Sequence, residues 1–239
     1  MNLLKLNAIT KKFGGLLALD HVSLQVDEKE VLGVIGPNGS GKTTLINVIS
    51  GFYQPDSGDI ILGDTNITRW PAHRISKAGI ARTFQNTRPF LNMTIKENVI
   101  VGALSVKSDI KEATEVAQKV LEETGLQGKA ERLAKDTSIQ DRKRLEVARA
   151  LSTSPKILLL DEPMAGLTEE EIRDFLALIQ RTRERGITII LIEHIVKAVQ
   201  QVADRITVLD YGKKICEGKP QEVVKNPDVL KAYLGEDYA

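Results

Sequence analysis

The chain has 239 residues, with 33 Lys and Arg against 32 Asp and Glu, a formal net charge of +1 at pH 7 and 42% hydrophobic residues. This composition fits a folded protein with one large domain, and the balanced charge argues against a nucleic-acid partner. The single cysteine, Cys216, excludes an intramolecular disulfide and a cysteine-based zinc site. No apolar stretch approaches the ~18 residues of a membrane span. Since residues 1–13 also lack a secretory core, we expect a cytoplasmic protein.

The first part of the chain reads as short strands around one glycine-rich loop. Alternating apolar residues predict strands at 4–9 and 22–26, joined by a turn at Gly14 and Gly15. The apolar run 31–35 predicts a buried strand that ends in a glycine-rich segment at 36–44. A helix is predicted from Thr44 to residue 49, and residues 59–62 predict another strand.

The rest of the chain alternates between helices and strands. From Lys107 charges are dense and apolar residues recur at helical spacing, with Gly125 as a stop; the predicted inward face holds Ile110, Ala113, Ala117, Val120 and Leu121. We interpret 85–135 as a helical subdomain inserted into a core formed by 1–84 and 136–239. Strands predicted at 157–160, 187–192 and 206–209 alternate with helices at 169–185 and 196–202, and short helices follow at 220–234. This alternation predicts an α/β fold with a mostly parallel sheet.

The glycine-rich segment matches the phosphate-binding loop pattern. It reads Gly36-Pro37-Asn38-Gly39-Ser40-Gly41-Lys42-Thr43 and continues with Thr44. Glycines let backbone N–H groups turn toward a polyphosphate, and the helix that follows adds its positive end. Lys42 is expected to reach the β- and γ-phosphates and the Thr43 hydroxyl to bind Mg²⁺. An ordinary glycine-rich turn is the alternative, but the strand before it and the helix after it favour the phosphate loop.

Two carboxylates follow the apolar run 157–160. Asp161 and Glu162 stand at the carboxyl end of a predicted core strand, which is where ligands bind in open α/β sheets. Asp161 is expected in the Mg²⁺ shell, and Glu162 is expected to accept a proton from an attacking water. The alternative is that both carboxylates are simply solvated at the end of a strand. The phosphate loop earlier in the chain favours the functional interpretation.

Two further polar residues are candidates for the same chemistry. Of the three histidines, only His194 follows a predicted core strand, and we expect it to bond the γ-phosphate and orient the water. Gln85, at the entry to the helical subdomain, is a candidate for Mg²⁺ or the water. His21 and His73 are taken as structural or surface residues.

Together these motifs resemble the ATP-binding cassette of ABC transporters. The resemblance is carried by the phosphate loop, Thr83-Phe84-Gln85, residues 144–151, residues 158–163 and His194, and it spans essentially the whole chain. It implies a P-loop NTPase core with an N-terminal antiparallel β subdomain, and a dimer of two cassettes around ATP and Mg²⁺. It also implies that Phe13 stacks on adenine and that Gln85 couples the nucleotide to a permease. Ala165-Gly166-Leu167-Thr168 resembles the loop that crosses the dimer interface, although an acid or amide usually stands where this chain has Thr168.

Within that family, the sequence is most similar to the ATPases of branched-chain amino-acid importers. The segments that carry this similarity are 13–16, 79–86, 93–99, 144–151 and the tail 226–236. The resemblance implies an ATPase on the inner face of the cell membrane that powers a permease, with a solute-binding protein as an indirect partner. We place the permease contact around residues 85–99. Cassettes for urea, other amino acids or lipid export, and a soluble cassette switch without transport, stay open as alternatives.

A kinase that uses the same phosphate loop is the other class. It would need an acceptor pocket, and it has no use for the pair of Gln85 and His194.

One segment departs from the family pattern. The family signature Leu-Ser-x-Gly-Gln is replaced by Thr137-Ser138-Ile139-Gln140-Asp141. The resemblance implies that Ser138 contacts the γ-phosphate of the opposite subunit. If Gln140 stands where a glycine has positive φ, its backbone is strained; alternatively, the loop takes another shape and donates fewer N–H groups to the opposite γ-phosphate. Asp141 would also repel the nucleotide unless Arg142, Lys143 and Arg144 offset it. We therefore expect poor dimerisation of the chain alone and a partner cassette with an intact signature.

Overall fold

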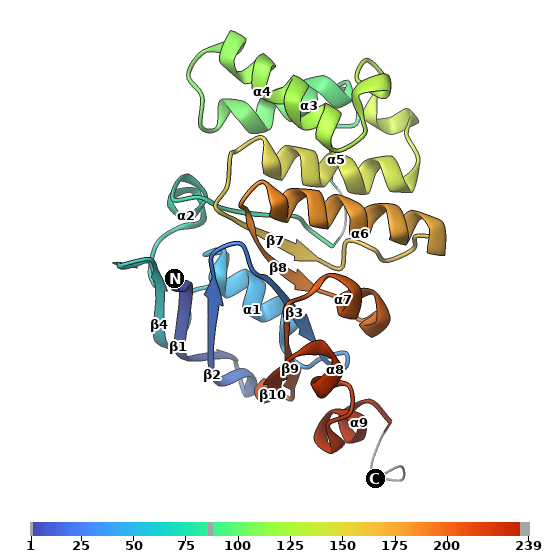
Figure 1. Cartoon of the computed structure of the whole chain (residues 1–239). Coiled ribbons are helices and arrows are strands. Elements are labelled where there is room, and N and C mark those ends of the chain that lie inside the picture. Colours follow the sequence, from blue (N-terminus) through green and yellow to red (C-terminus); the bar gives the residue numbers. More distant parts are fainter. Residues whose placement is uncertain (1, 86–87, 235–239) are drawn as a thin grey trace. The chain divides into compact units, whose positions relative to one another are not determined.

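The computed structural model describes residues 2–85 and 88–234 and divides the chain into two compact units. The first unit holds Met1–Ile75 and Thr188–Ala239, and the second holds Ser76–Ile187. Figure 1 labels their helices and strands. The predicted α/β fold class is confirmed, whereas the proposed helical subdomain at 85–135 stays a prediction.

An antiparallel sheet forms the N-terminal part of the first unit (Figure 1). Its strands are β1 (Asn2–Phe13), β2 (Leu16–Asp27), β4 (Ser57–Leu62) and β5 (Thr65–Asn66), in the order β2-β1-β4-β5. The predicted strand at 4–9 is the central part of β1, and the one at 22–26 lies in the C-terminal half of β2. Leu4, Leu6 and Ile9 of β1 are fully or almost fully buried, as the alternation of apolar residues predicts.

The same unit contains a set of buried parallel strands. β3 (Val31–Ile35) runs parallel to both β8 (Thr188–Ile192) and β9 (Arg205–Asp210), and β10 (Lys213–Gly218) pairs antiparallel with β9. Every residue of β3 and β8 is buried, which is why both read as continuous apolar runs. β10 was not predicted, because only the middle of this strand is apolar and its side chains are half-buried or exposed.

Four helices and most of a fifth complete the described part of the first unit. They are α1 (Lys42–Ile49), α2 (Ala72–Lys77), α7 (Val196–Val202), α8 (Pro220–Val223) and α9 (Pro227–Leu234). The last two residues of α2 belong to the second unit. The predicted start of the first helix at Thr44 is two residues late, because α1 begins directly after Gly41.

The second unit combines two parallel strands with longer helices. β6 (Ile80–Arg82) pairs with β7 (Ile157–Asp161). The helices are α3 (Ile95–Leu104), α4 (Ile110–Glu123), α5 (Ile139–Leu151) and α6 (Glu169–Glu184), with short 3₁₀ turns at Gln127–Lys129 and Ala134–Asp136. The inward face predicted for α4 is confirmed except at Ile110, which is exposed. Ile110 is the first residue of α4, directly after its N-cap Asp109.

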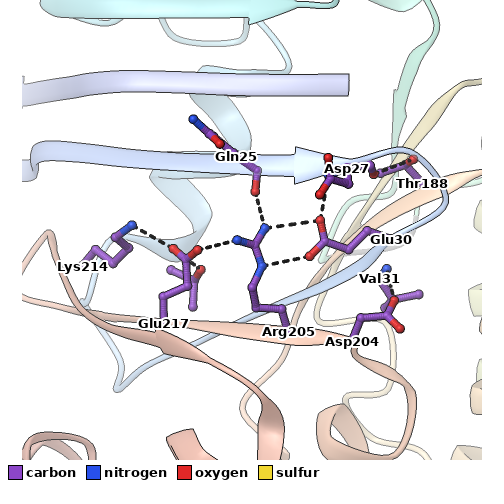
Figure 2. A network of polar contacts seen from close by, with 10 residues as sticks. Gln25, Asp27, Glu30, Val31, Thr188, Asp204, Arg205, Lys214 and Glu217 are labelled. Atoms are coloured by element: carbon purple, nitrogen blue, oxygen red, sulfur yellow. Dashed lines mark hydrogen bonds and ion pairs between the residues drawn. The ribbon is translucent and has the colours of Figure 1, made fainter. Parts of the chain in front are cut away.

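Arg205 joins both sheets of the first unit (Figure 2). Its guanidinium bonds Glu30 at 2.9 and 3.3 Å and Glu217 of β10 at 2.6 Å, and it also donates to the carbonyl of Gln25 in β2. Lys214 donates to the same Glu217 at 2.8 Å. The side chains of Arg205, Glu217 and Glu30 are only 29%, 21% and 10% exposed. Loss of the guanidinium would therefore leave two largely buried carboxylates without their main cation.

We predict that Arg205→Met lowers the free energy of unfolding by about 2–3 kcal/mol, since breaking a buried ion pair strands its partners. The matched control is Lys214→Met, which removes a single bond to Glu217 and leaves the Arg205 contact in place, so it should cost less than about 1 kcal/mol. Urea unfolding of both variants measures the difference. Equal urea midpoints in the two variants would show that the Arg205 network does not stabilise the contact between the two sheets.

Candidate functional site

The predicted phosphate loop connects a buried strand to a helix. β3 ends at Ile35, residues 36–41 form the loop, and α1 begins at Lys42 with Gly41 as its N-cap in a left-handed conformation (φ 103°). Asn38, Gly39 and Thr43 are exposed, whereas Ser40 is buried. A helix N-terminus presents N–H groups that no intrahelical bond uses, so this arrangement suits an anion.

Lys42 lies inside the curve of this loop. Its ammonium donates to the carbonyl oxygens of Gly36 at 2.7 Å and Pro37 at 2.9 Å, and to the Ser40 hydroxyl at 3.5 Å. The residue is only 5% exposed. The charge is therefore held at the start of α1 by polar atoms of the loop, and the sequence prediction for its place is consistent with the structure.

The loop requires glycine at Gly36 because the chain passes very close to a neighbour. A Cβ at Gly36 would lie 2.1 Å from the carbonyl oxygen of Leu209 and 2.6 Å from the Ser40 hydroxyl. Gly39 also has positive φ, at 80°, but a Cβ there would meet open space. The two glycines therefore serve different needs, close approach at one and backbone conformation at the other.

His194 follows β8 of the same unit, as predicted. Its side chain is half exposed, and its backbone N–H donates to the carboxylate of Glu193 at 3.2 Å. The Glu193 side chain is fully buried, and its oxygen lies 3.8 Å from Nδ1 of His194. Sequence reasoning gave no role to Glu193, although its buried carboxylate lies beside the imidazole of His194.

The first unit also contains Phe13, the residue expected to stack on adenine, and a groove that the loop lines. Phe13 packs edge-to-face on Tyr53 with centroids 5.0 Å apart, and Phe13 is 39% exposed. A groove of about 910 Å³ is lined by the loop and by residues of the C-terminal segment, including Leu16, Asn38, Tyr211 and Asp228. Burial raises the pKa of Tyr233 in α9, against the smaller opposing effect of the Gly36 backbone N–H. Residues of the last helix, α9, therefore line the same groove as the loop.

In the second unit, β7 ends at the predicted carboxylates. Asp161 is 1% exposed, and Nη2 of Arg82 lies 3.4 Å from its Oδ2. The Asp161 backbone N–H donates to the Thr83 hydroxyl at 3.3 Å. Burial lowers the pKa of Arg82, and the charges of Asp161 and Glu146 partly oppose that effect.

Glu162 and Gln85 are brought together by the second unit. The amide nitrogen of Gln85 donates to Oε2 of Glu162 at 2.7 Å, and the ammonium of Lys143 lies 3.3 Å from the Glu162 carbonyl oxygen. Glu162 has a φ of 48°, in the left-handed region that non-glycine residues rarely adopt. Such strain often marks functional sites. The sequence placed Lys143 near Asp141 as an offsetting charge and gave no sign of its contact with Glu162, because one lysine in a charge-rich helix does not indicate its partner.

The segment 137–141, which departs from the family signature, has a different structure from the one expected. Ser138 is the N-cap of α5, and its hydroxyl accepts the N–H of Asp141 at 3.1 Å. Gln140 is the second residue of this right-handed helix, so the expected strain from positive φ at Gln140 is wrong. Capping by serine fixes the helix start here, and a helical residue needs no glycine.

The cations expected to neutralise Asp141 were also wrong. The buried carboxylate of Asp141 is bound by the Lys129 ammonium at 2.7 and 2.8 Å. The three cations expected to offset it make other contacts: Arg142 donates to the carbonyl of Lys135, Lys143 to that of Glu162, and Arg144 to the carboxylate of Asp174. Lys129 is remote from the motif in sequence, so only the structure reveals this pair.

The comparisons with known proteins agree with the loop and the fold. The family model described as ABC transporter matches residues 19–165, and one described as branched-chain amino acid ATP-binding cassette transporter matches residues 213–239. A nucleotide-free ATP-binding cassette from an ABC transporter has a TM-score of 0.91 and 36% identity, covering 99% of this chain and all of that one. A cassette dimer with ADP and phosphate has a TM-score of 0.82 at 26% identity, covering 91% of this chain and 98% of that one.

Curated relatives match over almost the full length. The chain is 42% identical to the high-affinity branched-chain amino acid transport ATP-binding protein BraF of Pseudomonas aeruginosa, and 41% identical to LivG of Escherichia coli, with 98% of each chain covered. These findings define a nucleotide-binding cassette with a phosphate loop. The chain belongs to the ABC transporter family and is an ATPase of that family. None of the helices in the described ranges has the length and apolar character to cross a bilayer.

We predict that Gly36→Ala strongly weakens ATP binding and destabilises the chain, because its methyl group collides with a backbone carbonyl. Gly39→Ala is the matched control and should cost only about 1 kcal/mol, the penalty of positive φ. Thermal unfolding and nucleotide titration measure both effects. Equal losses in the two variants would contradict the close approach at Gly36.

Proposed function

We propose that this ATPase powers the import of branched-chain amino acids through membrane permease subunits. One observation carries the proposal: two relatives named for branched-chain amino acid transport align over 98% of both chains. The match of residues 213–239 to a model for the same transport class supports it independently. Cassettes for urea, other amino acids or lipids are the alternatives that the transport test below separates.

Nucleotide binding is assigned to the loop and its neighbours. The backbone of 36–41, with Thr43 and Thr44, would cradle the phosphates, and Lys42 would neutralise the β- and γ-phosphates. Phe13 would stack on adenine, since it is 39% exposed, although its ring packs on Tyr53 and the Lys11 ammonium lies over it, 5.5 Å from the ring centroid. Ser138, which already accepts one bond as an N-cap, keeps its hydroxyl proton to donate to a phosphate of a partner subunit.

The oxygen donors of the chain suit Mg²⁺. The hydroxyl of Thr43, the carboxylate of Asp161 and the amide oxygen of Gln85 are hard ligands of the kind this ion prefers. Among the described residues there is no cluster of three or more His, Cys, Asp or Glu that could hold a metal. That fits an ion that takes its other ligands from phosphates and water. When bound, Mg²⁺ would neutralise charge on the phosphates.

Hydrolysis is assigned to Glu162 and His194. Glu162 would accept the proton of the attacking water, and the bond from Gln85 fixes the direction of its carboxylate. His194 would bond the γ-phosphate and orient the water, with Glu193 behind it. Catalysis by these groups is mainly positioning and electrostatic stabilisation.

The partners follow from the family. A permease would dock around 85–99, a second cassette would complete the dimer, and a solute-binding protein would act through the permease. The chain would then work on the inner face of the cell membrane. Lys96 is a suitable probe of the docking surface because it makes only a surface ion pair with Glu131, whereas Glu97 closes the capping box of α3.

We expect Lys42→Ala to lose ATP affinity and hydrolysis together, whereas Glu162→Gln keeps ATP affinity and loses turnover by about 100-fold or more. Nucleotide titration and phosphate release measure the two effects. In cells, Glu162→Gln should abolish uptake of labelled leucine while urea uptake is unchanged. Parental phosphate release by Glu162→Gln would refute the role of this carboxylate, and unchanged leucine uptake would refute the proposed solute.

A second prediction concerns dimer closure. The side chain of Gln140 occupies the start of α5 at the position where the family pattern has glycine. Its bulk keeps another backbone at a distance, so we expect the chain alone to dimerise poorly and to pair with a different cassette that carries an intact signature.

In the Glu162→Gln background, Gln140→Gly should raise the ATP-dependent dimer fraction in light scattering, and Gln140→Ala should raise it less. A dimer fraction that neither variant changes would show that bulk at Gln140 does not limit closure.

A further inference from the structure

One buried carboxylate of α5 binds the backbone on both sides of Gln85. Oε2 of Glu146 accepts the N–H of Phe84 at 3.0 Å, and Oε1 accepts the N–H of Arg88 at 2.9 Å. Glu146 is only 6% exposed. Hydrogen bonds to a buried charged acceptor are stronger than neutral ones, and both oxygens are used. The backbone N–H groups of Phe84 and Arg88, one before Gln85 and one after it, are therefore both bound by the same side chain.

Two arginines accompany this carboxylate. Nη1 of Arg149 donates to the carbonyl oxygen of Arg88 at 3.0 Å, and Arg82 lies over the Phe84 ring at 4.5 Å. Burial lowers the pKa of both Arg82 and Arg149, and the negative charge of Glu146 opposes that effect in each. Glu146 thus serves as a counter-charge for two largely buried cations as well as an acceptor for two N–H groups.

The position of Glu146 on α5 connects the Gln85 region with Glu162. Lys143, Glu146 and Arg149 are spaced three residues apart, so they lie along one side of the helix. Lys143 reaches the Glu162 carbonyl, Glu146 and Arg149 hold the backbone around Gln85, and Gln85 itself bonds the Glu162 carboxylate. One row of charged side chains therefore fixes both partners of the Gln85–Glu162 hydrogen bond.

We propose that Glu146 is a positioning residue that sets the place of Gln85, and through it the direction of the Glu162 carboxylate. The proposal rests on the proposed function, in which Glu162 accepts the proton. It assigns α5 a second task besides its N-terminus at Ser138: the helix holds the Gln85 region in the place where its amide meets Glu162. A purely structural role, in which Glu146 only satisfies two buried N–H groups, is the competing explanation.

The test uses Glu146→Gln in the full chain. The amide keeps the size of the side chain but retains one acceptor oxygen, so one of the two N–H groups loses its partner. The matched control is Glu123→Gln, the same substitution at a partly buried carboxylate of the second unit, where it removes the ion pair with Arg185. Three quantities are measured: phosphate release, ATP affinity, and hydrogen exchange of the amides of Phe84 and Arg88.

We expect Glu146→Gln to lower kcat by about tenfold, the equivalent of one charged hydrogen bond, with ATP affinity changed less than about twofold. Exchange at Phe84 and Arg88 should accelerate, and the control should change none of these quantities. Glu146→Asp, which keeps the charge on a shorter stem, should recover part of the rate. These results would separate positioning from a general loss of stability, because the control loses a partly exposed ion pair in the same unit.

A double-variant cycle decides whether Glu146 acts through Gln85. If it does, adding Glu146→Gln to Gln85→Ala slows turnover no further. The same loss on both backgrounds, or parental kcat in Glu146→Gln, would overturn the proposal. A parental chain that releases no phosphate would instead refute the proposed function. In that event the exchange experiment still decides, since unchanged exchange at Phe84 and Arg88 would overturn the positioning role on its own.

Discussion

The burial of β3 between two parallel strands determines the geometry of the phosphate loop. β3 pairs with β8 on one side and β9 on the other, and all five of its residues are buried. Because Ile35 is fixed in register with Val208, the next residue passes within van der Waals contact of the Leu209 carbonyl, and only glycine fits there. The close turn at Gly36 and the position of Lys42 both follow from this pairing rather than from the loop sequence alone.

The sequence predicted those parts of the fold whose signal is local. Apolar runs located β3, β7 and β8, and the glycine pattern located the loop, because burial on both faces and conformational freedom leave direct traces in residue types. β10 was missed because its residues are mixed in polarity and its pairing with β9 is decided by tertiary contacts. The strand ends that carry Asp161, Glu162 and His194 were predictable for the same reason as the strands.

The contacts that hold the candidate residues were less predictable. Glu146 is adjacent to Leu145 and Val147 in an amphipathic helix, where an acid usually indicates a solvated face, yet it is almost fully buried. Lys129 and Asp141 are twelve residues apart, separated by a 3₁₀ turn, and no periodic pattern links them. Long-range side-chain pairing of this kind depends on how helices pack, which residue types and spacing do not encode without the fold.

The structure also changes the physical account of the departed segment at 137–141. Two objections from the sequence, strained backbone at Gln140 and repulsion by Asp141, both lose their basis, because α5 starts normally at Ser138 and Lys129 neutralises the carboxylate. What remains is the volume of the Gln140 side chain at a helix start. Asp141 is then better seen as part of the support of α5 than as a defect, since its replacement would leave Lys129 without its partner. The departure therefore alters the surface that a partner meets and leaves the interior of the second unit intact.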